Sequence, residues 1–185
     1  MVGYIAVLPE WRRAGVARYL FSYELKRLRR AGVGYLLGEV EMYGRREARE
    51  HLKLLCQAEG GKLSRRARLR MAELEVKRQR VIAMGKLGFQ LVDRFPYFQP
   101  DVGGGVFPMH LVVLPVRAKV RTLDGQELLS RLKIIHENEV IYKNNMSAYP
   151  RIRMRVLRHR RQGKSSYKVI RLSPVNLQSV PVMIL

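Results

Sequence analysis

Short runs of apolar residues, separated by turns, mark the strands that the chain predicts. Residues 4–8 form such a run, and Pro9 ends it because proline has no N–H to donate to a strand ladder. Residues 33–41 predict a second strand. Its period of two places alternate side chains on one face, namely Tyr35, Leu37, Glu39 and Glu41. Residues 107–114 are apolar almost throughout and precede Pro115, so they carry the strongest strand signal.

Apolar residues at helical spacing fill much of the sequence between these runs. This pattern predicts a helix from residue 14 or 15 to residue 30, and two strands joined by one helix indicate a parallel crossover. Residues 45–58 predict another helix, with Ala48, Leu52 and Leu55 on one stripe. Ser64 is a suitable N-cap for a helix extending to about residue 87. Residues 87–93 then predict a helix end, a turn and a strand.

The last third of the chain alternates turn signals with helical and strand signals. Residues 97–105 contain one proline and three successive glycines and predict a loop. Asp124 and Glu127 stand at the spacing of a capping box and predict the start of a helix that extends to about residue 142.

Arginine dominates the sequence that follows this helix. Over residues 151–156 arginines alternate with apolar side chains, as in a half-buried or surface strand. No acidic residue occurs from 143 to 185, so we expect a basic tail there, with only weak strand signals at its end. Together the patterns predict an α/β fold in which a mixed β-sheet is flanked by helices and followed by a basic C-terminal extension.

The net charge indicates which partners the chain attracts. The 185 residues include 36 Lys and Arg against 15 Asp and Glu, a net charge of +21. Such a surface attracts anions: CoA, nucleic acid, an anionic membrane surface or an acidic protein. Cys56 is the single cysteine, so an intrachain disulfide is excluded. The absence of a signal-peptide pattern and of an apolar run of about 18 residues predicts a cytoplasmic protein without a membrane span.

The turn between the first predicted strand and the first predicted helix suits an anion. The first N–H groups of a helix have no intrahelical partner, and the helix dipole is positive at that end. Gly15 lets the backbone approach a ligand closely, and the small Ala17 leaves room beside it. Arg12 and Arg13 add positive charge, so the turn is a candidate phosphate-binding site. A basic strand-to-helix turn without this function would have a similar sequence.

Two segments of the sequence resemble GCN5-related N-acetyltransferases. The turn, Val7-x-Pro9-x-x-Arg12-x-x-Gly15-x-Ala17, is similar to the acyl-CoA pyrophosphate loop of that family, Gln/Arg-x-x-Gly-x-Gly/Ala. Residues 78–89 resemble the family's C-terminal helix ending in Leu-Gly-Phe, and the strands predicted after them match its last two strands. Residues 39–41 resemble the family's Glu-Val-Glu. The resemblance covers roughly residues 2–117, with irregular spacing across 42–75.

The resemblance implies a partial acyl-CoA N-acyltransferase fold in residues 1–117, followed by a helical extension (118–142) and a basic tail (143–185). It implies acetyl-CoA as co-substrate, whose acyl group is transferred to an unknown amine by direct attack. Glu39 and Glu41 are the candidate bases for that amine. Backbone amides of the first strand would bind the pantetheine arm and the turn would hold the pyrophosphate, through Ala6, Val7, Arg12, Arg13, Ala14, Gly15, Val16, Ala17 and Arg18.

Two departures from the family's pattern bear on activity. Complete members have further strands and helices before the acyl-CoA strand, and these shape the acceptor side; here we expect either a truncated product or a sheet that another chain completes. Many members also place a tyrosine, as general acid for the CoA thiolate, where this sequence has Met84. A sheet edge left open predicts homo-oligomers and poor solubility at low salt.

Other classes of site have weaker sequence support. The four histidines (His51, His110, His136 and His159) lack metal-ligand spacing, so we expect no metal site, and Cys56 has no neighbouring histidine and is expected to be inert. The competing hypothesis is a nucleic-acid-binding protein, with tyrosines near the basic tail as stacking residues: Tyr142, Tyr149 and Tyr167. A catalytically inactive fragment is the third hypothesis.

Overall fold

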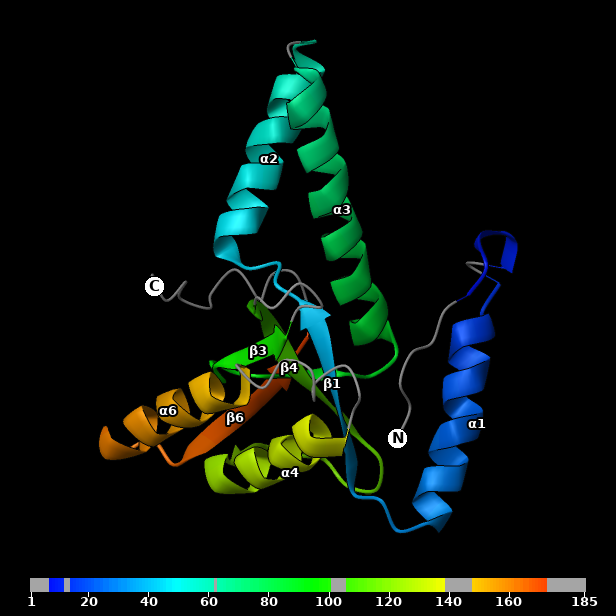
Figure 1. The fold of residues 1–185 in the computed structure, drawn as a ribbon. Helices are drawn as coiled ribbons and strands as arrows, with labels where there is room; N and C mark the ends of the chain where they lie inside the picture. The colour runs from blue at the N-terminus through cyan, green and yellow to red at the C-terminus, as the bar shows by residue number, and fades with distance from the viewer. Residues whose placement is uncertain (1–6, 12–13, 62, 101–105, 139–147, 173–185) are drawn as a thin grey trace.

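The computed structural model describes residues 7–11, 14–61, 63–100, 106–138 and 148–172, and shows an antiparallel β-sheet with helices on both faces (Figure 1). Its elements are the 3-10 turn η1 (Pro9–Trp11), α1 (Val16–Arg30), β1 (Tyr35–Glu41), α2 (Arg45–Glu59), α3 (Arg65–Lys86), β2 (Gln90–Val92), β3 (Tyr97–Pro100), β4 (Val106–Pro115), β5 (Thr122–Asp124), α4 (Gly125–Asn138), α6 (Ala148–Arg161) and β6 (Ser166–Arg171).

Strand β4 lies at the centre of the sheet. It pairs antiparallel with β1 along its whole length, from Tyr35 opposite Pro115 to Glu41 opposite Met109. It also pairs with β2 and with β3, and β2 in turn pairs with β6, so that the strand order is β1-β4-β2-β6-β5. The strong apolar run of the sequence is therefore the strand on which three others are aligned.

Both faces of β4 are buried, which explains its nearly continuous apolar sequence. Leu111 and Val113 belong to one core cluster, whereas Val112 and Leu114 belong to the other. Helices α4 and α6 cover the first face, with Leu128, Leu132, Ile152 and Val156 fully or almost fully buried. Helices α1 and α3 cover the second face, through Phe21, Leu25, Leu74 and Val81. The sheet is thus the middle layer of three.

Helices α2 and α3 form a hairpin that projects from the sheet (Figure 1). Ser64 caps α3, since its Oγ accepts a hydrogen bond from the Ala67 amide at 3.2 Å, as its place in the sequence predicts. The helix ends at Lys86, and Gly88 follows with φ 95°, a left-handed conformation that glycine adopts without strain. The helices expected from residue 14 or 15 to 30, over 45–58 and from 64 to about 87 are confirmed.

The strand predicted over residues 151–156 is wrong. These residues lie in helix α6, where Ala148, Ile152 and Val156 are buried and Met154 is 66% exposed. Burial at every fourth residue is the period of a helix, and only the chance alternation of Arg with Ile, Met and Val gave the strand pattern. The described part of the expected tail, residues 148–172, also contributes β6 to the sheet and Tyr167 to the core.

Two other expectations differ from the structure in detail, and the cap expected at Asp124 is confirmed. Residues 97–100, expected as loop, form β3, because they pair with residues 106–109 of β4; residues 101–105 lie outside the described part. All pairings between described strands are antiparallel, so the parallel crossover is not seen: residues 4–6 are not described, and Val7 and Leu8 belong to no strand. Asp124 caps α4 by accepting hydrogen bonds from the amides of Gln126 and Glu127.

The helical register of α6 can be tested with two alanine substitutions. We expect Ile152→Ala to lower the free energy of unfolding by roughly 2–5 kcal/mol, because it opens a cavity in a filled core. Met154→Ala should change it by less than about 0.5 kcal/mol, since that side chain is exposed. Chemical denaturation measures both. Equal losses would indicate a strand, in which residues two apart share a face.

Candidate functional site

A 3-10 turn, η1, precedes helix α1 in the chain. The amide of Trp11 donates to the carbonyl of Leu8 at 3.0 Å and closes the η1 turn. Gly15 is the residue before the helix and has φ 81°, in the left-handed region that other residues enter only with strain. Its carbonyl accepts the first helical hydrogen bond, from the amide of Tyr19 at 2.9 Å. The backbone therefore favours a glycine at this position.

The N-terminal end of α1 is open and electropositive. Among the described residues, no side chain caps it, and its first turn holds no acidic residue. A Cβ built on Gly15 would have no atom within 4 Å, so space lies beside the turn. Ala14, Gly15 and Arg18 are exposed, and Val16 and Ala17 are half-buried. Backbone N–H groups and the helix dipole both favour an anion at such an end.

Three predicted acetyl-CoA residues cannot be placed beside this helix end. Ala6, Arg12 and Arg13 lie outside the described residues. Val7 is half-buried and lies just before the η1 turn. The structure therefore assembles the second half of the predicted loop, from Ala14 to Arg18.

The two glutamates expected as bases have different contacts. Glu39 accepts a hydrogen bond of 2.7 Å from the hydroxyl of Tyr97, a residue on β3 that is only 4% exposed. The hydroxyl holds the Glu39 carboxylate in one orientation beside the centre of the sheet. Tyr97 was missed because the glycines and the proline that follow it predict a loop, and its pairing with Met109 depends on residues distant in sequence.

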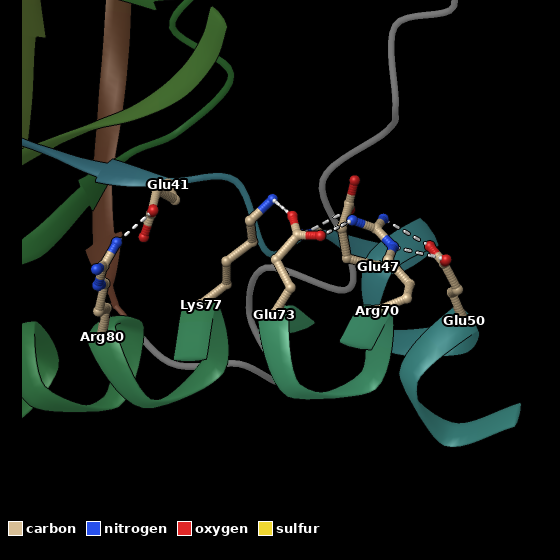
Figure 2. A network of polar contacts seen from close by, with 8 residues as sticks. Glu41, Glu47, Glu50, Arg70, Glu73, Lys77 and Arg80 are labelled. Carbon is tan, nitrogen blue, oxygen red and sulfur yellow. Dashed lines mark hydrogen bonds and ion pairs between the residues drawn. The ribbon is translucent and has the colours of Figure 1, made fainter. Parts of the chain in front are cut away.

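Glu41 lies at the end of β1 and forms an ion pair with Arg80 of α3 (Figure 2). Its other oxygen, Oε2, is buried and has no hydrogen-bond partner among the described residues. The same side of α3 carries further pairs, in which Arg70 bridges Glu50 and Glu73 and Lys77 bonds Glu73. Glu41 is thus part of the row of contacts that anchors α3, whereas Glu39 bonds Tyr97 of β3.

Met84 occupies the position at which the resembled family has its tyrosine. The methionine lies on the side of α3 that faces β1: a Cβ built on Gly38 would stand 3.8 Å from Met84 Cε and 3.2 Å from Phe89 Cε1. Gly38 therefore leaves room for Met84 beside the strand that carries Glu39. A thioether has no proton to donate, so this position supplies no general acid.

No protein-family model, curated protein or solved structure significantly matches this chain. The resemblance to N-acetyltransferases rests on the sequence motifs alone.

A polar chain at the base of the hairpin was not predicted. The Tyr43 hydroxyl and His51 Nδ1 lie 2.9 Å apart in a hydrogen bond, and His51 Nε2 lies 3.7 Å from Glu75. Hydrogen bonds from Arg78 lower the pKa of Glu75 to about 2. This polar chain joins the β1–α2 connection, α2 and α3. Because Tyr43 and His51 are each at most 4% exposed, it offers neither an accessible phenol nor an accessible imidazole. No motif spacing in the sequence signals it.

The described residues show few other features of a ligand site. A hollow of about 620 Å³ lies along the outer side of α2, between residues 49 and 60, and is lined by Cys56 but by none of the predicted site residues. No group of three or more His, Cys, Asp or Glu side chains in the described ranges is arranged to hold a metal ion. Within the same ranges, no helix combines the length and apolar character needed to cross a bilayer.

His110 is a buried titratable residue that the sequence did not distinguish. It lies on β4 opposite Val40, is 6% exposed, and its Nε2 has no hydrogen-bond partner among the described residues. Burial lowers the pKa of His110 from its ordinary 6.5 to about 4. The imidazole is therefore neutral at pH 7 and serves the core of the second face.

This burial predicts how stability depends on pH. The unfolded chain binds a proton at His110 as the pH falls below 6.5, whereas the folded chain does so only near 4. The contribution of neutral, buried His110 to the free energy of unfolding is therefore fully present above pH 6.5 and is lost as the pH falls towards 4. The loss amounts to about 3 kcal/mol. Urea denaturation between pH 7.5 and 4 should show a loss of stability that is about 3 kcal/mol larger in the parent than in His110→Leu, because the other groups with lowered pKa values, such as His136 and Glu75, titrate in both. Parallel profiles would mean that His110 is solvated or paired.

Proposed function

We propose that this chain binds acetyl-CoA at the turn before α1 and transfers the acetyl group to an amine by direct attack. The observation that carries the proposal is Gly15 in a left-handed conformation directly before an uncapped helix end. This geometry suits the one part of the sequence that most resembles the family's pyrophosphate loop. The acceptor amine is not identified by any residue of the chain.

The described part of the loop fits a pyrophosphate group. The first amides of α1 are positioned to donate hydrogen bonds to phosphate oxygens, and Gly15 offers no side chain to obstruct them. Arg18 is exposed within the same turn and supplies a charge that phosphate would neutralise. No acidic residue of the first turn of α1 opposes this binding.

Glu39 is the better candidate for the base in this proposal. In acyl transfer the amine nitrogen bonds to the acetyl carbon, the carbon–sulfur bond breaks, and the amine gives up a proton. Glu39, oriented by Tyr97, would accept that proton directly or through water, while Arg80 engages Glu41. Because Met84 cannot donate, the thiolate of CoA would take its proton from water. The lack of a general acid at position 84 also agrees with the alternative, a chain that binds acetyl-CoA without catalysing transfer.

The proposal predicts that Gly15→Asp abolishes acetyl-CoA binding. The substitution adds a negative charge at the phosphate position and forces a non-glycine residue to φ 81°. We expect saturable binding by the parent in calorimetric titration at about physiological salt, and at least a tenfold weaker affinity in the variant.

Gly61→Asp is the matched control, because Gly61 also has positive φ (67°) and open space around it, but lies at the tip of the hairpin. It introduces the same charge and similar backbone strain, and should bind acetyl-CoA like the parent. Unchanged binding by Gly15→Asp, or an equal loss in both variants, would contradict the assigned loop. Thermal unfolding establishes that each variant is folded.

A further inference from the structure

Helix α6 carries six arginines within its 14 residues: Arg151, Arg153, Arg155, Arg158, Arg160 and Arg161. From residue 148 to residue 172 the sequence contains no Asp or Glu. Among the described residues, none of the six arginines forms an ion pair with a carboxylate. The positive charge of this helix is therefore not neutralised within the described chain.

Some arginines on other helices do have carboxylate partners. In α1 Arg27 pairs with Glu24, in α4 Arg131 pairs with Glu127, and in α3 Arg70 pairs with two glutamates (Figure 2). The acidic residues of the chain are thus used within helices and across the hairpin, and α6 receives none of them.

The inner side of α6 is fixed on the sheet, so its outer side is a rigid surface. Ala148, Ile152 and Val156 are buried against β3 and α4, whereas Arg151, Arg158 and Arg161 are exposed. Arg151 and Arg161 are ten residues apart, or about 15 Å along the helix axis. Arg155 lies between them and is held in place by packing over the ring of Phe98, 4.6 Å from its centroid.

The cations of this surface repel one another. Burial and then the charges of Arg158 and Arg151 lower the pKa of Arg155. Burial and then Lys164, Arg155 and Arg158 lower the pKa of His159. The free protein therefore holds several like charges close together at a cost, and a bound polyanion would relieve that repulsion.

The side chains nearby favour the backbone of a duplex over a single strand. Single strands are bound by stacking bases on exposed aromatic rings, but Tyr167 is fully buried with its hydroxyl 3.0 Å from His159 Nδ1. Tyr149 packs on the core and on His136, and Tyr142 lies outside the described residues. Guanidinium groups bind phosphate oxygens without any stacking partner. Binding to an anionic membrane surface would need large exposed apolar side chains, and the one on the described α6 is Met154. This favours nucleic acid over a membrane as the polyanion.

We propose that the outer side of α6, with Arg151, Arg155, Arg158 and Arg161, binds the phosphate backbone of double-stranded nucleic acid without reading its sequence. The surface lies on the face of the sheet opposite to α1, since α6 packs on the first core cluster and α1 on the second (Figure 1). It is therefore separate from the proposed acetyl-CoA site. Neutralising each phosphate releases a counterion, so the affinity falls steeply with salt.

The test replaces three exposed arginines and measures binding to a fluorescent 20-base-pair DNA by anisotropy. At about 100 mM salt, Arg151→Gln/Arg158→Gln/Arg161→Gln should bind on the order of 10–100 times more weakly than the parent. The slope of log affinity against log salt should become shallower by roughly 2–3, because three phosphate contacts are lost. Arg155 is retained in this variant because its packing on Phe98 contributes to the fold.

The matched control removes three charges from α2, as Arg45→Gln/Arg49→Gln/Lys53→Gln. These side chains are also exposed and also lack carboxylate partners among the described residues, so the net charge changes equally. The control should bind the duplex within about threefold of the parent, and so should Gly15→Asp. Equal losses in the α6 and α2 variants, an unaffected α6 variant, or tighter binding of the parent to the single strand of the same length would overturn the proposal.

Discussion

Strand β4 is the element on which the other parts of the structure depend. Its backbone hydrogen bonds align β1, β2 and β3, and its alternate side chains divide the apolar residues between two cores. A slip of one residue in its register with β1 would exchange the two faces and expose both sets of side chains. The burial of His110 follows from the same alternation, because a residue between Leu111 and Met109 must face the second core.

The uneven use of carboxylates explains the distribution of charge. With 36 basic and 15 acidic residues, only some of the cations can be paired. The hairpin has several glutamates within reach, and Glu50, Glu73 and Glu75 hold Arg70, Lys77 and Arg78. The side chains of these pairs are between 24% and 49% exposed, so each pair contributes little to stability. Helix α6 carries six of the arginines that remain without a carboxylate partner among the described residues, and, unlike α2, it has no acidic residue of its own.

Local sequence signals predicted those parts of the fold that depend on local interactions. The caps of α3 and α4 and the end of α1 each follow from residues within a few positions. The errors concern parts that depend on distant residues. Strand β3 forms because residues 97–100 pair with residues 106–109 of β4. The helical register of α6 is seen only once β3 and α4 bury its apolar side chains. In the candidate site, Gly15 was predictable, whereas the contacts of Tyr97 with Glu39 and of Arg80 with Glu41 depend on how the sheet and the hairpin pack.

The two proposed anion sites bind their ligands through different groups, so that either proposal can be wrong while the other holds. The end of α1 offers backbone amides and a helix dipole that act over a few ångströms, so its ligand must be small and its affinity should tolerate moderate salt. Helix α6 offers side-chain charges spread over about 15 Å, so its ligand must be extended and its affinity must fall with salt. The sheet stands between them, with α1 and α6 on opposite faces. If both sites are occupied together, the chain would hold an acetyl donor on one face and a polyanion on the other. The acceptor amine would then be sought among proteins that accompany nucleic acid.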